Sequence, residues 1–289
     1  AVSAAFVATV VDGDPLSPTG KKAAWLQDGS FANFGSVMEI GTVRRLAGAG
    51  MIGGICNAVA GGGTFFTLPA MLAAGVPPVV ANATSAVSIW PGHASSLLGY
   101  RSELGRHRAA LRRSLPVVGA GSLVGAALLV FTGDAQFSRL VPWLILVATV
   151  LFALGPWLRQ AIERHARGQV PHLVAAGAEF LTALYGGYFG AGLGIMLMAI
   201  LTLLGVRDVQ EANAVKNAMA TVVTSAAVML FVATGSIAWT QGSAVLLGAI
   251  MGGYTGARLA RWIPPLALRW TIVATGLALS AYFGLKAGA

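Results

Sequence analysis

The chain has 289 residues, of which 56% are hydrophobic and only 10% are charged. Soluble domains carry about 25% charged residues, so this composition excludes an ordinary soluble enzyme, a disordered chain and a collagen-like chain. The net charge of +9 does not indicate nucleic-acid binding, because the cations fall between long apolar runs, as the positive-inside rule predicts. The composition therefore predicts an integral membrane protein.

The first 45 residues differ from the rest of the chain. Residues 1–11 are apolar but too short to span a bilayer, and residues 12–30 are polar and rich in turn-forming residues. Residues 31–40 fit either a short amphipathic helix at the membrane surface or a loosely attached tail. We treat residues 1–45 as an N-terminal extension of the membrane core.

Runs without charged residues locate the expected membrane segments. The first run, 46–100, is long enough for two crossings at about 20 residues each. The later runs are 114–133, 140–158, 168–206 apart from Glu179, 217–257 and 270–285. None shows the period-two alternation of barrel strands, so we expect an all-α polytopic membrane protein.

The two halves of the chain carry similar short motifs in the same order. Three motifs recur about 130 residues apart: the glycine-rich segments 60–64 and 190–194, Gly75-Val76 and Gly205-Val206, and Ala81-Asn82-Ala83 and Ala212-Asn213-Ala214. We therefore predict two transmembrane repeats, residues 46–158 and 172–289, joined by a linker of residues 159–171. Such duplication is typical of secondary transporters.

Glycine clusters interrupt the apolar runs at matching places in the two halves. Adjacent glycines form a poor helix, and unpaired backbone groups at membrane depth occur only inside protein or beside a water-filled cavity. We predict helix breaks at Gly61, Gly62 and Gly63 in the first half, and at Gly190, Gly192 and Gly194 in the second. Paired breaks indicate a binding site between the halves. For Gly186-Gly187 and Gly252-Gly253 we expect close helix packing instead.

Polar side chains near these breaks form the candidate substrate path. Asn213, Lys216 and Asn217 lie on one predicted helical face, and a cation on such a stripe indicates a path for an anion. The alternative is a lysine that snorkels from the helix start. The candidate substrate-binding residues are Asn57, Gly61, Gly62, Gly63, Thr64, Asn82, Thr84, Ser85, Gly190, Gly192, Gly194, Asn213, Lys216 and Asn217.

Other chemistry-bearing residues are few. Glu179 is a candidate for proton coupling, or else an interfacial residue near the linker, and His93 fits a helix-end histidine. The sequence has no cluster of metal ligands, no nucleotide-binding loop and no nucleophile motif. We expect no catalytic residue, no metal and no cofactor. The membrane potential favours export of an anion by about 2.3 kcal/mol per 100 mV, so uptake would need a coupled cation, either H+ or Na+.

The order of motifs in the first half resembles a known family. The motifs are the glycine-rich stretch 53–64, Leu68-Pro69, the turn 75–78 and the helix start Ala81-Asn82-Ala83-Thr84-Ser85. Together they resemble the TauE/SafE sulfite and sulfonate permeases, and the likeness covers about residues 46–286. Residues 57–60 depart from the family, in which a Gly-hydrophobic-Gly run is common. The resemblance implies a multi-pass carrier of the bacterial inner membrane for sulfite, sulfoacetate, a taurine-like compound or another sulfonate.

The expected function is therefore a secondary transporter that works by alternating access. Half-helix N-termini near Gly63 and Gly194 would present N–H groups to the anion, and Lys216 would supply the countercharge. The expected partners are this anion and the lipid bilayer, with nucleic acid excluded and a homo-oligomer open. The alternatives are an anion channel and a carrier for a different small anion.

Two topologies fit the charge-free runs. In the first, eight helices cross and the halves are parallel; in the second, each half crosses three times, its broken segment re-enters the membrane, and the halves are inverted. Both place 13 Lys and Arg inside and 6 outside, so charge does not separate them. We favour the inverted arrangement because a site between inverted broken helices suits alternating access.

Overall fold

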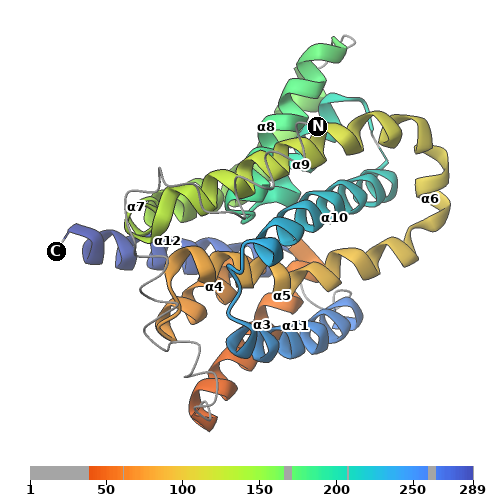
Figure 1. Ribbon diagram of the computed structural model, residues 1–289. Helices are drawn as coiled ribbons and strands as arrows, with labels where there is room; N and C mark the ends of the chain where they lie inside the picture. Colours follow the sequence, from red (N-terminus) through yellow and green to blue (C-terminus); the bar gives the residue numbers. More distant parts are fainter. Residues whose placement is uncertain (1–38, 61, 166–170, 207, 260–264, 289) are drawn as a thin grey trace.

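The computed structural model describes residues 39–60, 62–165, 171–206, 208–259 and 265–288, and this part of the chain is all-α, as predicted. Its helices are α3 (Ile40–Ala60), α4 (Thr64–Ala73), α5 (Pro78–Gly99), α6 (Arg101–Arg106), α7 (Arg108–His165), α8 (His172–Tyr188), α9 (Leu193–Leu203), α10 (Val209–Ala233), α11 (Trp239–Leu259) and α12 (Pro265–Gly288). Figure 1 shows α5 and α10 between the other long helices.

Several predicted boundaries differ from the observed ones. Helix α3 begins at Ile40, inside the expected extension, and α7 continues to His165, so the first part of the expected linker is helical. A membrane helix can extend past the last uncharged residue, because long charged side chains at its end reach the aqueous interface while the backbone stays helical. The expected run 217–257 is divided by a turn of residues 234–238 between α10 and α11. The possible surface helix at 31–40 lies outside the described residues, except Glu39 and Ile40.

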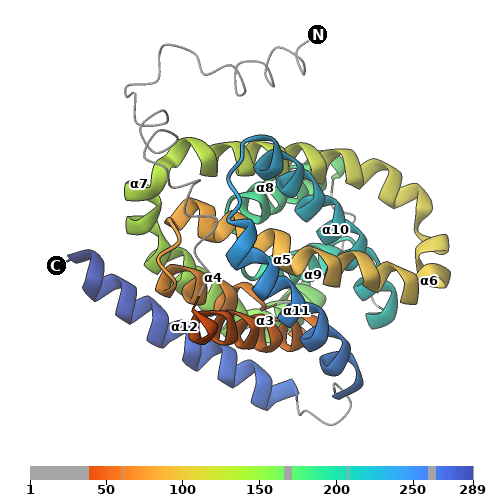
Figure 2. The ribbon, with the colours of Figure 1, turned by 60° about the horizontal axis from the view of Figure 1, so that its bottom comes forward.

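Helix α7 contains a reversal of direction at its centre. Gly133 has φ 73° and ψ 162°, a conformation that glycine tolerates and other residues rarely adopt. The segment before it packs on α8 and α10, whereas the segment after it packs on α12 through a Ser280 hydroxyl that donates to the Pro142 carbonyl over 2.9 Å. Two expected spans are thus joined at Gly133, and Figure 2 shows that α7 is bent.

Both helix interruptions are present. The first separates α3 from α4, and the second lies between Tyr188 and Leu193, where Gly190 and Gly192 have φ values of 80° and 78°. Gly194 belongs to the first turn of α9, so its predicted place in the break is wrong. The positive φ values of Gly190 and Gly192 already end the preceding helix, and α9 begins at Leu193, one residue before Gly194. Gly61 lies outside the described residues.

Each interruption turns the chain back on the preceding helix. A Cβ on Gly63 would lie 2.8 Å from the carbonyl oxygen of Gly53 and 3.1 Å from Cβ of Asn57, so α4 lies antiparallel to α3. Likewise, a Cβ on Gly186 would lie 2.8 Å from Cδ1 of Leu193 in α9. The short helices α4 and α9 are therefore the second arms of two helical hairpins.

The two Gly-Val pairs end these second arms in the same way. Gly75 follows α4 with φ 79°, and the Val76 amide donates to the Met71 carbonyl over 3.1 Å. Gly205 follows α9 with φ 83°, and the Val206 amide donates to the Leu201 carbonyl over 3.0 Å. Both are Schellman endings, in which a left-handed glycine lets a later amide satisfy a free helix carbonyl.

Glycines bring two pairs of helices into close contact. A Cβ added to Gly54 of α3 would overlap the Ala249 carbonyl oxygen of α11, and a Cβ added to Gly252 of α11 would overlap the Met51 carbonyl oxygen of α3. The pair α7 and α8 has the same kind of contact, which involves Gly125 with Leu184 and Gly187 with Ser122. Packing was the expected role of Gly186-Gly187 and Gly252-Gly253, and it is confirmed for Gly186, Gly187 and Gly252. The backbone nitrogen of Gly253 lies in the same contact, 2.8 Å from a Cβ added to Gly54, although a Cβ added to Gly253 itself would meet nothing within 4 Å. Figure 2 shows α3 beside α11.

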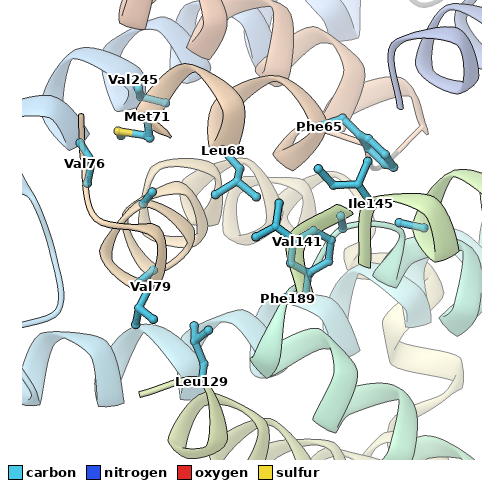
Figure 3. Packing of buried hydrophobic residues seen from close by; sticks show 14 of the residues in the cluster. Phe65, Leu68, Met71, Val76, Val79, Leu129, Val141, Ile145, Phe189 and Val245 are labelled. Carbon is cyan, nitrogen blue, oxygen red and sulfur yellow. The ribbon is translucent and has the colours of Figure 1, made fainter. Parts of the chain in front are cut away.

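Helix α4 is held inside the protein by its apolar side chains. Phe65, Leu68 and Met71 are buried and pack against α7 and α11, as Figure 3 shows. The rings of Phe65 and Phe152 meet edge to face with centroids 5.5 Å apart, a favourable arrangement. The position of this half-helix therefore depends on its packing with α7 and α11.

The outside of the described part is apolar. Large side chains exposed along the long helices include Leu128, Phe131, Trp143, Leu154, Leu181, Met229, Leu247 and Met251. Within the described ranges, two helical stretches are long and apolar enough to cross a membrane, Arg108–Trp157 and Gln210–Ala233. An apolar exterior of this kind is what a lipid environment requires.

Candidate functional site

Helices α5 and α10 carry most of the candidate residues, and they pack antiparallel. Near the start of α5, the Thr84 hydroxyl accepts a hydrogen bond of 3.0 Å from the Ala238 amide, just beyond the end of α10. Midway, Trp90 Nε1 donates to Ser225 Oγ over 2.7 Å. Beyond the end of α5, His107 lies 3.0 Å from Glu211 in the first turn of α10. The two helices thus run side by side in opposite directions through the centre of the protein (Figure 1).

One group of polar residues gathers where the first hairpin meets α5 and α10. We call Asn57, His93, Asn213 and Lys216 the lysine cluster. Lys216 Nζ donates to Asn213 Oδ1 over 3.1 Å, and its charge acts on His93. Beside His93, a Cβ on Gly92 would lie 3.6 Å from Asn57 Nδ2. The cluster therefore combines one ammonium group with amide and imidazole groups from three helices.

Lys216 is distinguished from the other cations by its burial. Among the lysines and arginines whose side chains the structure describes, seven arginines are exposed and only Lys216 is partly buried. A snorkelling lysine would extend toward water, but Nζ instead contacts the amide one turn back on the same helix. A desolvated cation held among uncharged donors has the character of an anion-binding site.

A second group lies at the other end of α5. Asn82 and Ser85 are almost completely buried. Asn82 Nδ2 donates to the Tyr188 carbonyl over 3.0 Å, which connects α5 to the last residue of α8 at the second interruption. The sequence placed Asn82 among the candidate substrate-binding residues; in the structure its amide donates to the backbone of the other half.

The remaining candidates have other surroundings. Thr84 joins α5 to the turn after α10, and Asn217 is partly buried, with its carbonyl accepting the Thr221 hydroxyl over 2.7 Å. Thr64 and Gly62 are buried, and Gly62 faces Phe152 and Ile272. The structure thus places Thr84 in a packing contact between the halves.

Glu179 is buried between α7 and α8. Ser114 Oγ donates to its carboxylate over 2.8 Å, and only 4% of Glu179 is exposed. It is the only fully buried acid among the described side chains. This burial argues against the alternative that Glu179 is an interfacial residue. Its partner Ser114 could not be identified from the sequence, because no sequence pattern shows which group a hydroxyl will bond.

Two further contacts were missed by sequence reasoning. His93 was interpreted as a helix-end residue, but it lies six residues before the end of α5 and within electrostatic range of Lys216. Its position next to Gly92 was the available signal, since a glycine inside a helix often marks the close approach of another group. Tyr185 also contributes, because its hydroxyl donates to the Ala191 carbonyl over 2.9 Å and closes the second interruption.

The first turn of α9 is closed by the interruption itself. The Leu193 amide donates to the Gly190 carbonyl over 3.3 Å, and the Ile195 amide donates to the Gly192 carbonyl over 3.0 Å. These two amides already donate to backbone carbonyls, so fewer free N–H groups remain at the start of α9 to bind an anion than the sequence indicated. No group of three metal-binding side chains occurs within the described ranges.

Comparisons with known proteins give a family model and several relatives that match this chain. Residues 46–283 match the family model described as "Sulfite exporter TauE/SafE". A "Probable membrane transporter protein" of Haemophilus influenzae is 31% identical over 73% of this chain and 82% of its own length. A "Probable membrane transporter protein ORF9" of Sinorhizobium is 28% identical over 73% of this chain and 80% of its own length. A "Probable membrane transporter protein YfcA" of Escherichia coli K12 is 26% identical over 72% of this chain and 77% of its own length. No solved structure matches.

Proposed function

This chain belongs to the TauE/SafE family of membrane transporters, and on that premise we propose that it carries a small sulfur oxyanion or sulfonate across the membrane by alternating access. The observation that carries the proposal is Lys216, a partly buried cation near the start of α10 whose ammonium group donates to the Asn213 amide oxygen. A sulfonate or sulfite group has three acceptor oxygens and a delocalised negative charge, which suit one ammonium group surrounded by amide donors.

In the proposed site, Lys216 neutralises the anion while neighbouring amides orient its oxygens. Asn57 lies near the tip of the first hairpin, where its Nδ2 would be 3.6 Å from a Cβ added to Gly92, the neighbour of His93. Asn213 lies in the first turns of α10 and is bonded to Lys216. Asn213 Oδ1 accepts from Lys216, which leaves the amide nitrogen to donate to the substrate. Asn217, one turn further along α10, supplies another amide on the same face.

The proposed mechanism needs two inverted halves, and the helix contacts support that arrangement. Gly252 meets Met51 and Ala249 meets Gly54, as Gly125 meets Leu184 and Ser122 meets Gly187. The two contacts correspond residue by residue: each α3 residue lies 133 positions before its counterpart in α8, and each α7 residue lies 127 positions before its counterpart in α11. The equivalent helices α5 and α10 are antiparallel. From these contacts we infer that the halves are related by inversion and that the α3–α4 and α8–α9 hairpins re-enter from opposite sides.

Charge at the two ends supports one orientation. Of the described basic residues, nine arginines lie at the end that holds α6 and the start of α10: Arg101, Arg106, Arg108, Arg112, Arg113, Arg159, Arg164, Arg258 and Arg269. Four lie at the opposite end: Arg44, Arg45, Arg139 and Lys286. By the positive-inside rule the arginine-rich end faces the cytoplasm.

Cysteine labelling tests this topology. Cys56 is the single cysteine and is buried, so a Cys56→Ser background can carry Gly105→Cys, Ala260→Cys or Ser138→Cys. The inverted arrangement predicts that cysteines at 105 and 260 react with an impermeant thiol reagent only after the cells are opened, whereas the cysteine at 138 reacts in intact cells. A cysteine at 260 that reacts in intact cells would support parallel halves and exclude the inverted arrangement.

Ligand binding tests the substrate class. We expect purified protein in detergent to bind one or more of sulfite, sulfoacetate, taurine and thiosulfate, and to bind chloride and acetate more weakly. The comparison with acetate matters because it has one negative charge but only two acceptor oxygens. Equal binding of all these anions, or binding of none, would contradict a sulfur-anion transporter.

A further inference from the structure

Two buried polar atoms lack a hydrogen-bond partner, and they lie together. Among the described residues, the only such side-chain atoms are Asn82 Oδ1 and Ser85 Oγ. Other buried hydroxyls of the core find carbonyls four residues back, namely those of Ser88, Thr149, Thr202 and Thr224. Leaving a buried polar atom unpaired is costly, so two such atoms three residues apart on one helical face indicate a missing ligand.

The surroundings of these atoms define the charge of that ligand. Asn82 Nδ2 donates to the Tyr188 carbonyl over 3.0 Å, which fixes the amide and leaves Oδ1 as an acceptor. Tyr188 ends α8, and the last carbonyls of a helix carry partial negative charge. Asp134 lies near the start of α5, where its Oδ1 accepts from the Val79 amide over 2.9 Å. An anion would be repelled by these oxygens, whereas a cation would be attracted.

The matching position in α10 shows what a cation does there. At an offset of 131 residues, Asn82 corresponds to Asn213 and Ser85 to Lys216. The Asn213 oxygen is paired with the ammonium group of Lys216 at 3.1 Å. In α5 the lysine is replaced by a serine, and the Asn82 oxygen has no partner. A diffusible cation between Asn82 and Ser85 would occupy the place that the tethered ammonium occupies in the other half.

We propose that the chain binds a sodium ion between Asn82 Oδ1, Ser85 Oγ and the Tyr188 carbonyl oxygen. Amide, hydroxyl and carbonyl oxygens at a helix interruption are typical ligands of a monovalent cation in transporters. Calcium and magnesium sites instead rely on carboxylates, and the one nearby carboxylate that the structure describes, Asp134, caps α5. Coupling rests on the proposed function: sodium bound in one half is carried together with the anion bound in the other.

Sodium binding is measured without any anion. Purified full-length protein in detergent is equilibrated with radioactive sodium, with choline as the replacing cation. We expect saturable binding that Ser85→Ala weakens at least about tenfold, the scale on which metal sites lose affinity when their shells are altered. Ser88→Ala is the matched control, because Ser88 is a buried serine of the same helix whose hydroxyl already donates to Thr84 and Gly242; it should bind as the wild type does.

Thermal unfolding gives a second readout that also verifies folding. Ser85→Ala removes an unpaired hydroxyl, so in choline it should melt at or above the wild type. Sodium should raise the melting temperature of the wild type and of Ser88→Ala but not that of Ser85→Ala.

Absence of sodium binding, or equal binding by Ser85→Ala, would overturn the sodium site. If that variant and the wild type still bind sulfur anions, the transport proposal stands alone. Sodium binding with no anion binding would support the site and overturn the proposed substrate.

Discussion

Replacing Lys216 with alanine will weaken binding of the sulfur anion by about 10- to 140-fold. A hydrogen bond to a charged group contributes about 1.5–3 kcal/mol, and every 1.4 kcal/mol is a factor of ten in affinity. Lys216 is the only partly buried cation among the described basic side chains, so no neighbouring charge can replace it. The effect is measured as the dissociation constant of the best-bound sulfur anion.

Two control variants separate charge from packing. Lys216→Arg keeps the charge and should retain most of the affinity, although the planar guanidinium fits a lysine site imperfectly. Arg113→Ala removes an exposed cation from α7 and should leave affinity unchanged. Wild-type affinity in Lys216→Ala would remove this residue from the site, and with it the main support for an anion substrate.

Adding one methyl group at Gly252 will lower stability by about 1–3 kcal/mol, as overpacking of a tight contact does. A Cβ there would overlap the Met51 carbonyl and lie 2.8 Å from Met51 Cα, so α11 would have to move away from α3. The neighbour Gly253 is the matched control, because an added Cβ meets nothing within 4 Å. Gly253→Ala should be neutral or stabilising by up to about 1 kcal/mol, since alanine is the better helix former.

The comparison is made by thermal unfolding in one detergent. The melting temperature of Gly252→Ala should fall below that of the wild type, and Gly253→Ala should match or exceed it. Gly125→Ala, which is equivalent to Gly252→Ala in the contact of α7 with α8, should behave like Gly252→Ala. Equal melting temperatures for the variants at 252 and 253 would show that α3 and α11 are not in this close contact.

The sequence predicted local features well where one residue type determines the backbone. Glycine clusters located both helix interruptions, and the Gly-Val pairs located two turns that prove to be Schellman endings. Gly194 was misplaced because a glycine in a first helical turn looks the same in sequence as one outside the helix. The kink at Gly133 falls on the last residue of the expected span 114–133, and the helix resumes directly after it.

Neighbour relations could not be read from the sequence. Apolar runs carry no record of which helix faces which, so nothing indicated that α3 pairs with α11 and α7 with α8. The same limit explains Asn82, whose partner is a backbone carbonyl 106 residues away, and His93, whose relation to Lys216 depends on the antiparallel packing of α5 and α10. Lys216 itself was identifiable because a charge inside an apolar run is rare enough to stand out.

The most direct test of the transport mechanism is sulfite counterflow. Proteoliposomes loaded with unlabelled sulfite are diluted into buffer with a trace of radiolabelled sulfite. A carrier that alternates its access exchanges internal for external sulfite, so we predict that label accumulates transiently above its equilibrium level, and that Lys216→Ala abolishes this overshoot. Entry of label that rises only to equilibrium, accompanied by single-channel currents in planar bilayers, would contradict the account and identify an anion channel.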